Sequence, residues 1–208
     1  MNRKIISYLI AMQFAALISS TFGHTGETKA LFNGKNLEGW KIENGGTFFV
    51  ENGLLKINKG TGWLRSVDTF KDFTLTTEVR FLEEAANSGV FVRTGPTSKS
   101  DENGWPDNGY QVQLQDNLVP PAPLATMIPY GAPPFKHVSD LEKIKATYTG
   151  LNEWQILEIT CFGETMTVKL NGELVTISVS IQNLDGHIGI QGENGVLEFR
   201  KIEVEILN

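Results

Sequence analysis

The sequence predicts an all-β fold in which two antiparallel sheets pack face to face. Apolar and polar residues alternate with a period of two through most of the chain, whereas a sustained helical period is nearly absent. The alternating runs are short, and many of the 21 glycines lie in the turns between them. Many short strands separated by glycine-rich turns are typical of a two-sheet sandwich.

The beginning of the chain predicts an export signal. Arg3 and Lys4 precede an apolar run from Ile5 to Ile18, and small and polar residues follow as far as Gly23. This order is typical of a signal peptide, and the apolar run is too short to span a bilayer comfortably. We expect residues 1–23 to be removed, which leaves an exported protein, periplasmic or secreted, with no membrane span. The remaining residues have the length of a single domain.

The charge of the mature chain argues against nucleic acid as a partner. The whole sequence has 18 basic and 24 acidic residues, and the export signal contains two of the basic ones. The mature chain therefore has 16 basic against 24 acidic residues, a net charge of −8. A nucleic-acid-binding protein needs an excess of positive charge, at least locally. The sequence does not indicate an oligomeric state.

The single cysteine, Cys161, is interpreted as a buried thiol, because it lies in phase with the apolar residues Leu157 and Ile159. It has no partner for an internal disulfide. A catalytic cysteine would need a neighbouring histidine, and all three histidines lie far away in sequence. Since such residues can still meet in space, a catalytic thiol stays an open alternative.

The strands follow from the alternation. It is clearest from Phe73 to Phe81, where the odd positions form an apolar face and the even positions a polar one. Asn171 and Gly172, between two apolar runs, predict a hairpin turn. We interpret Trp40 and Trp154 as core residues. Further strands are expected at residues 48–50, 54–57, 90–93, 110–114, 154–160, 188–191 and 196–206.

One segment interrupts this pattern. Val119 to Phe135 contains six of the eight prolines, which excludes a central strand. Prolines lower the entropy of a loop, and loops on a sandwich carry specificity, so we expect a stiff segment along the rim of a binding cleft. A short helix is expected after it, because Val138, Leu141 and Ile144 share one helical face.

A series of short motifs runs through nearly the whole mature chain. In order they are Leu31-Phe32-Asn33-Gly34, Gly39-Trp40, Gly62-Trp63-Leu64, Asp72-Phe73, Glu78-Val79-Arg80, Asn87 to Arg93, Gly109 to Leu114, Asp116-Asn117, Glu153-Trp154, Val168 to Gly172, Gly189-Ile190-Gln191 and Glu198-Phe199-Arg200. None is specific alone, but their order and spacing resemble the 3-keto-disaccharide hydrolase family.

This resemblance implies a concanavalin A-like jelly roll whose concave sheet binds sugar. It also implies a substrate already oxidised to a ketone at C3, a 3-keto-glycoside or 3-keto-disaccharide. The ketone acidifies the C2 hydrogen, so one base can remove that proton and the C1 substituent can leave by elimination. Such an enzyme needs a base, an enolate stabiliser and an acid for the leaving group. Relatives usually show a glutamate where this chain has Gln111.

The candidate catalytic residues are Glu78, as base or metal ligand, with Arg80 and Arg93 as stabilisers of the enolate. Glu78 and Arg80 lie two apart on one polar strand face, so their side chains emerge side by side, about 7 Å apart. Salt-bridging residues of this kind are also common on exposed sheet faces. Arg93 ends an otherwise uncharged strand, and the competing interpretation is a structural arginine that bonds loop carbonyls.

The candidate substrate-binding residues are amides and aromatic rings. Gln111 and Gln113 alternate with apolar residues on one strand, and Gln191 ends another. Amides both donate and accept hydrogen bonds, as sugar hydroxyls require. The other candidates are Asp116, Trp63, Trp105 and Tyr130. We expect one concave cleft to bring together Glu78, Arg93, Gln113 and Gln191.

Several other kinds of site have no motif in this sequence. A Ser-His-Asp arrangement, a phosphate loop, a Cys/His zinc cluster and a carboxylate-rich calcium loop are not evident. No cofactor is indicated, although a divalent cation held by scattered oxygens would leave no motif. The alternative to an enzyme is a lectin-like carbohydrate-binding domain, which the same fold hosts and which Gln111 favours.

Overall fold

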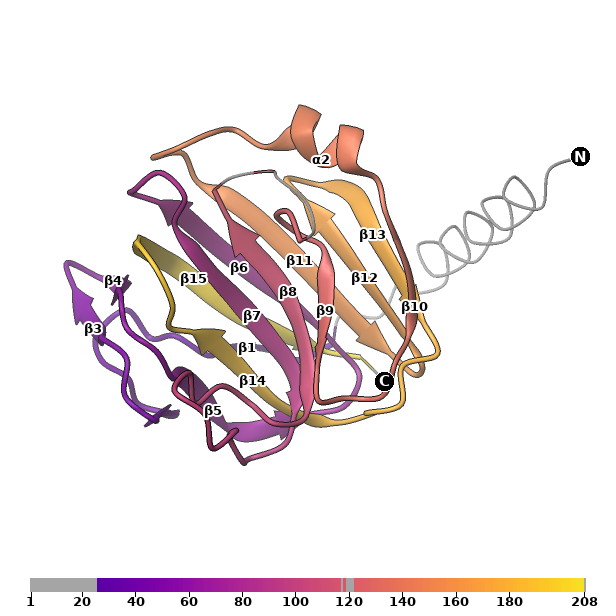
Figure 1. The fold of residues 1–208 in the computed structure, drawn as a ribbon, viewed down its shortest axis with the longest axis horizontal. Helices are drawn as coiled ribbons and strands as arrows, with labels where there is room; N and C mark the ends of the chain where they lie inside the picture. The colour runs from indigo at the N-terminus through magenta and orange to yellow at the C-terminus, as the bar shows by residue number, and fades with distance from the viewer. Residues whose placement is uncertain (1–25, 117, 119–121, 208) are drawn as a thin grey trace, which may run out of the picture.

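Two antiparallel β-sheets stacked face to face make up the structure (Figure 1). The structure is a computed structural model that describes residues 26–116, 118 and 122–207. The predicted all-β sandwich is confirmed. The predicted export signal lies outside the described residues. Within them, no helix is long and apolar enough to cross a membrane.

The larger sheet has nine strands in the order β10-β13-β12-β11-β6-β15-β4-β3, with β1 also paired to β15. Its strands are β1 (Thr28–Ala30), β3 (Phe48–Glu51), β4 (Leu54–Asn58), β6 (Phe73–Phe81), β10 (Lys136–Ser139), β11 (Gln155–Phe162), β12 (Thr165–Leu170), β13 (Glu173–Val179) and β15 (Val196–Ile206). A short helix, α2 (Leu141–Thr147), packs beside β13.

The smaller sheet has six strands in the order β2-β5-β14-β7-β8-β9. Its strands are β2 (Trp40–Glu43), β5 (Trp63–Phe70), β7 (Asn87–Thr94), β8 (Gly109–Gln115), β9 (Met127–Tyr130) and β14 (Gly186–Gln191). In Figure 1 the strands β14, β7, β8 and β9 lie side by side in front of the larger sheet.

Local sequence explains why these segments form strands. Along β6 the odd positions are buried and the even ones partly exposed, as the alternation predicts. The β12–β13 hairpin turns at Asn171 and Gly172, with φ of 48° and 88°, which these two residue types tolerate better than others. Both predictions are confirmed.

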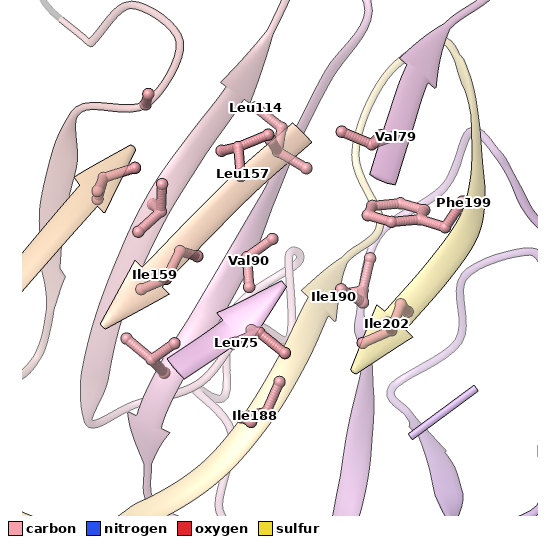
Figure 2. Close-up of a cluster of buried hydrophobic side chains, with 14 of the residues drawn as sticks. Leu75, Val79, Val90, Leu114, Leu157, Ile159, Ile188, Ile190, Phe199 and Ile202 are labelled. Carbon is pink, nitrogen blue, oxygen red and sulfur yellow. The ribbon is translucent and has the colours of Figure 1, made fainter. Parts of the chain in front are cut away.

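The core lies between the sheets (Figure 2). Leu75, Val79, Leu157, Ile159, Phe199 and Ile202 point inward from the larger sheet toward Val90, Leu114, Ile188 and Ile190 of the smaller one. Cys161 is in the same cluster, and burial raises the pKa of its thiol to about 12. A thiol of this kind stays protonated and is a poor nucleophile, as expected for a core residue.

The proline-rich segment is only partly a loop. Its residues 127–130 form β9, an edge strand that pairs with β8 alone. Pro129 is tolerated there because an edge strand leaves some of its N–H groups without a ladder partner. The segment borders β8, which carries Gln111 and Gln113, and its expected place along the rim of a binding cleft stays a prediction. Part of the segment, residues 119–121, lies outside the described residues.

Candidate functional site

The glutamines lie on the outer face of the six-stranded sheet. Tyr110, Val112 and Leu114 of β8 belong to the core cluster between the sheets. Because side chains alternate along a strand, Gln111 and Gln113 point to the opposite side. On β14, Ile188 and Ile190 are likewise core residues, so Gln191 also faces outward. These predicted binding residues share one face.

A pair of amides spans the middle of this face. The Nε2 of Gln111 donates to the Oε1 of Gln191 at 2.6 Å, from β8 to β14, across the intervening strand β7. The crossing point is Gly89, where a Cβ atom would lie 1.8 Å from Gln111 Nε2. A residue other than glycine at that position would displace Gln111 and break the pair.

A carboxyl and a phenol lie beside this pair. Burial raises the pKa of the Glu193 carboxyl above its usual range, and a hydrogen bond from Asn87 offsets the rise in part. Burial, with help from the charges of Glu193 and Asp101, raises the pKa of Tyr130 to about 12. The amide of Gln191, close to the phenol, opposes this shift. The phenol therefore stays protonated at neutral pH.

Gln113 completes the group. Its Nε2 donates to Asn87 Oδ1 at 2.6 Å and, less closely, to Gln115 Oε1 at 3.3 Å. We use the name carboxyl–phenol site for a set of five residues: Asn87, Gln113, Tyr130, Gln191 and Glu193. The site combines a carboxyl whose proton affinity is raised, a protonated phenol and three amides, which is sufficient to bind hydroxyl groups and to move one proton.

Four aromatic rings continue this face. Edge-to-face contacts join Trp63 to Phe91 at 5.8 Å, Phe91 to Tyr130 at 5.4 Å and Tyr130 to Trp105 at 5.9 Å between ring centroids. Trp63 lies across Gly189 of β14, where a Cβ atom would come within 2.5 Å of the indole ring. The structure therefore brings the three predicted aromatic residues together with the glutamines.

The loop between β7 and β8, residues 95–108, lies over the aromatic part of the face. Its hydrogen bonds reach three different places: Trp63 Nε1 donates to Ser98 Oγ at 2.9 Å, Trp105 Nε1 donates to Gly192 O at 2.9 Å, and Asn44 Nδ2 donates to Gly104 O at 2.9 Å. In addition, the ammonium group of Lys99 lies 5.0 Å from the centroid of the Tyr130 ring. Trp63 and Phe91 are completely buried as a result.

Glu78 and Arg80 lie on the other sheet. Both are on β6, on the outer face of the nine-stranded sheet, where Glu78 pairs with Arg200 and Arg80 pairs with Glu198 at 2.6 Å. The expectation that one cleft unites Glu78 with the glutamines is wrong. Alternation identifies the polar side of a strand, but it does not identify the sheet that the strand joins.

Trp154 belongs to this second face and is not a core residue. Its ring lies 4.7 Å from the guanidinium carbon of Arg80 and 4.5 Å from that of Arg200. Trp154 is half-buried between these side chains. Its interpretation as core is therefore wrong, whereas Trp40 is buried as expected, with its indole N–H donating to Leu31 O.

Arg93 does not join either outer face. Its guanidinium group is fully buried and donates to the carbonyls of Lys71, Gly163 and Asn183, and it pairs with Asp72 at 3.1 Å. These contacts fit the competing interpretation, in which Arg93 is a structural residue that bonds loop carbonyls. Its positive φ of 50° interrupts the regular strand geometry, so its expected phase with Gly89 and Phe91 does not hold.

Asp116, at the end of β8, accepts hydrogen bonds from Ala85 N and from the Tyr148 hydroxyl. These contacts tie three segments together, and none of them involves the carboxyl–phenol site. These partners fit a residue that holds the end of the strand, not the expected substrate-binding residue.

A second polar cluster lies at the other end of the same sheet. Arg65 donates to Glu43 at 2.8 Å and lies 3.3 Å from the His187 ring. Burial, together with the Arg65 charge, lowers the pKa of His187, so its ring is neutral at pH 7. The charges of Arg65 and Glu43 satisfy each other. Within the described residues, no three His, Cys, Asp or Glu side chains gather to hold a metal ion.

Glu193 and Asn87 were missed by the sequence analysis. Both lie at the ends of strands, outside the alternating pattern that indicated the other candidates. The signal that could have found Glu193 was its place two residues after Gln191, in a glycine-containing turn beside a binding strand.

Comparison with known proteins identifies a family model, described as a 3-keto-alpha-glucoside-1,2-lyase-like domain, that matches residues 27–205. No curated protein matches the chain.

Three solved structures illustrate the fold similarity. A protein of Parabacteroides distasonis classed with the glycosyl hydrolases has 22% identity and a TM-score of 0.62, over 87% of this chain and 100% of that one. The carbohydrate-binding module CBM66 of Bacillus subtilis has 16% identity and a TM-score of 0.56, over 80% and 95%. A β-glucanase of Bacillus licheniformis has 12% identity and a TM-score of 0.51, over 89% and 100%. At these identities the similarity shows the concanavalin A-like sandwich and nothing finer.

Proposed function

We propose that the protein cleaves the glycosidic bond of 3-keto-glycosides at the carboxyl–phenol site. The chain belongs to the family of 3-keto-alpha-glucoside-1,2-lyase-like domains. The family and its fold relatives support a carbohydrate-related function. The predicted export signal would place this activity outside the cytoplasm. Glu193 replaces Glu78 as the proposed base.

The observation that carries this proposal is the environment of Glu193. Its carboxyl is half-buried, has a raised pKa and lies near the phenol of Tyr130 among three amides. A base works best when its pKa lies near the working pH, and burial moves a carboxyl in that direction. Perturbed carboxyls that are not part of an ion pair are typical of functional sites.

The reaction moves one proton twice, to Glu193 and then to the aglycone, and it breaks the C2–H and C1–O bonds. Glu193 takes the C2 proton, and the C–H electron pair forms an enolate whose negative charge lies on the C3 oxygen. The enolate then forms a C1–C2 double bond and expels the aglycone, which keeps the C1–O electron pair. The proton on Glu193 passes to the aglycone oxygen, which restores the carboxylate. Addition of water to the double bond completes the hydrolysis.

The other residues of the site supply hydrogen bonds. The protonated phenol of Tyr130 is a donor for the enolate oxygen, where negative charge develops. Asn87, Gln113 and Gln191 donate and accept as neighbouring sugar hydroxyls require. Arg80 and Arg93 lie elsewhere, so neither is assigned to the enolate.

Gln111 fits this arrangement as part of the floor. The resemblance to the family implies a glutamate at its position, and the amide here is engaged with Gln191 and Ser88 O. A glutamine has no basic carboxylate, so a base must come from another residue, and Glu193 lies on the same face. Gln111 also favours the second candidate function, a lectin-like domain that binds sugar without cleaving it.

The test is incubation of the purified protein with a 3-keto-α-glucoside and, separately, with the unoxidised parent. We expect the 3-keto compound to release its aglycone and the parent to stay intact. Proton NMR of both sugars measures the release. Exchange of the C2 hydrogen in D₂O would report the first step directly. Binding of the 3-keto compound without exchange or release would contradict the enzyme and establish the lectin-like domain.

A further inference from the structure

Part of the outer face of the six-stranded sheet has the chemistry of a sugar site but is closed to solvent. Trp63, Phe91, Gln111 and Gln191 are each 0% exposed, although all four point away from the core between the sheets. We call these four residues the covered strip. The outer face of a sheet normally contacts water. Here Ser98 of the loop of residues 95–108 bonds Trp63, while Tyr130 of β9 packs on Phe91 and lies close to the Gln191 amide.

The amide pair in this strip is incompletely satisfied. Gln111 Oε1 and Gln191 Nε2 are buried and form no hydrogen bond of normal geometry with the described residues, although the Tyr130 phenol lies close to the Gln191 amide. The alternative orientation of the two amides does not remove the problem. If the oxygen and nitrogen of both side chains are exchanged, one hydrogen bond still joins them, and one atom of each amide again has no partner within the pair. Two apolar side chains of similar shape would avoid this penalty. The unpaired donor and acceptor therefore point to a ligand with hydroxyl groups.

Two glycines make the strip flat. Gln111 lies across Gly89 and Trp63 lies across Gly189, and in both places a Cβ atom would collide with the side chain above it. An indole ring and an amide pair thus lie close against the sheet, next to each other on β14 and β7. A pyranose has one face of C–H groups for an aromatic ring and hydroxyls at its edge for amides. The strip has no charged residue, which fits a neutral sugar.

The cover is attached by few bonds. Ser98, Asn103 and Gly104 of the loop accept hydrogen bonds from Trp63 Nε1, Gly62 N and Asn44 Nδ2, and Trp105 donates to Gly192 O. These are single hydrogen bonds between neutral groups, which are weak in net terms because water replaces them when they open. Lys99 and Trp105 of the loop also contact the Tyr130 ring, and Asn108 accepts a hydrogen bond from Asn183. Opening would also free the Trp63 N–H for a ligand.

We propose that the covered strip is a binding position for a second, neutral pyranose ring, which the loop of residues 95–108 exposes when it lifts. This proposal rests on the proposed function for the first ring, which lies at the carboxyl–phenol site. Gln191 belongs to both, so the two positions adjoin. A disaccharide then fills both positions, and a monosaccharide glycoside fills only the first.

The first test uses Gln111→Leu, with binding measured by calorimetry. The probes are trehalose, an unoxidised disaccharide, and methyl α-glucoside. We expect Gln111→Leu to weaken trehalose binding about tenfold or more and to weaken methyl α-glucoside binding much less, because Gln111 reaches the first ring only through Gln191. The thermal midpoint should stay the same or rise, since a buried unpaired amide is lost. A lowered midpoint with unchanged trehalose binding, or no trehalose binding by the wild type, would overturn the proposal.

The second test loosens the cover without touching the strip. Asn44→Asp keeps the shape of the side chain and its tolerance of positive φ, but it loses the donor to Gly104 O. If only molecules with an open loop bind trehalose, the apparent affinity is the intrinsic affinity multiplied by the fraction of open molecules. Losing one hydrogen bond of the closed loop raises that fraction, so trehalose binding should tighten roughly fivefold. Asn33→Asp, with the same charge change in an exposed turn, is the matched control. Equal trehalose affinity in all three proteins would show that the loop does not have to move.

The two trehalose binding tests separate the strip proposal from the proposed reaction, because neither binding test needs turnover. If 3-keto-glycosides are not cleaved but both trehalose results hold, the strip proposal stands and the proposed reaction fails. If 3-keto-glycosides are cleaved but Gln111→Leu affects both probes equally, the reaction stands and the strip proposal fails.

Discussion

The polar side chains on the outer faces of the two sheets differ in charge and in how completely they are paired. On the nine-stranded sheet the polar groups are charged and paired: Glu198 binds Arg80 at 2.6 Å and Lys56 at 3.1 Å, and Glu78 binds Arg200. On the six-stranded sheet, Arg65 and Glu43 form an ion pair at one end, but at the end that carries Gln191 the polar groups are mostly neutral amides. Two of these amides have an unpaired buried atom, and the carboxyl of Glu193 has a raised pKa.

The difference teaches where to look for function. A paired charge has already used its hydrogen-bonding capacity within the protein, so it stabilises the sheet and offers little to a ligand. An unpaired amide or a carboxyl with a raised pKa has a capacity that the protein alone does not use. By this criterion we propose the six-stranded sheet as the one that carries the site, even though the other face has more charge.

The largest expected effect is on turnover. Glu193→Gln keeps the shape and hydrogen bonding of the side chain but cannot accept the C2 proton, so kcat should fall about 10³-fold with little change in binding. Glu78→Gln, the same change on the other face, should leave kcat within about twofold of the wild type. The assay is release of aglycone from a 3-keto-α-glucoside. The reverse ranking of the two variants would return the active site to the nine-stranded sheet.

The fold could be predicted from the sequence because its determinants are local. Alternation along Phe73–Phe81 and the Asn171-Gly172 turn depend on residues that are neighbours in the chain, and the structure has both. The short edge strands β9 and β10 were not expected as strands, because Pro129 and few apolar residues hide their period. Pairing with β8 and β13 makes them strands.

The site could be predicted only in part, because it depends on which strands are neighbours in space. Gln113 and Glu78 both lie on polar strand faces, and no local pattern shows that they belong to different sheets. Arg93 turned inward because a positive φ changes its direction. The raised pKa of Glu193 comes from residues distant in sequence, so its position in the chain gave no indication of it.

A smaller effect is expected on stability from Arg80→Met. Burial alone would raise the pKa of Glu198, but hydrogen bonds from Arg80 and Lys56 outweigh it, and the folded pKa lies below the ordinary value. The variant leaves Glu198, almost completely buried, with Lys56 as its remaining partner. We expect a loss of about 2 kcal/mol in the free energy of unfolding at pH 7, measured in urea.

The pH dependence of this loss identifies its cause. A depressed carboxyl pKa adds stability that is present above the unfolded pKa and disappears as pH falls through the folded pKa. The wild type should therefore lose stability faster than Arg80→Met as pH falls below about 4.5, and the difference between them should shrink. Lys59→Met, which breaks an exposed pair with Glu83, is the control and should change stability little at any pH. A difference independent of pH would mean that the contact of the Arg80 guanidinium group with the Trp154 ring supplies the stability.

The smallest effect is expected from the pair of Glu78 and Arg200. Arg200 is about half exposed, and its guanidinium group lies over Trp154 whether or not Glu78 is charged, so the pair adds little. A double-mutant cycle of Glu78→Gln and Arg200→Gln should give a coupling free energy of about 0.5 kcal/mol, which about 1 M salt removes by screening. A coupling above about 2 kcal/mol that resists salt would show a pair shielded from solvent. The contrast between a face of ordinary surface charges and a face with a site would then no longer explain the positions of the polar residues.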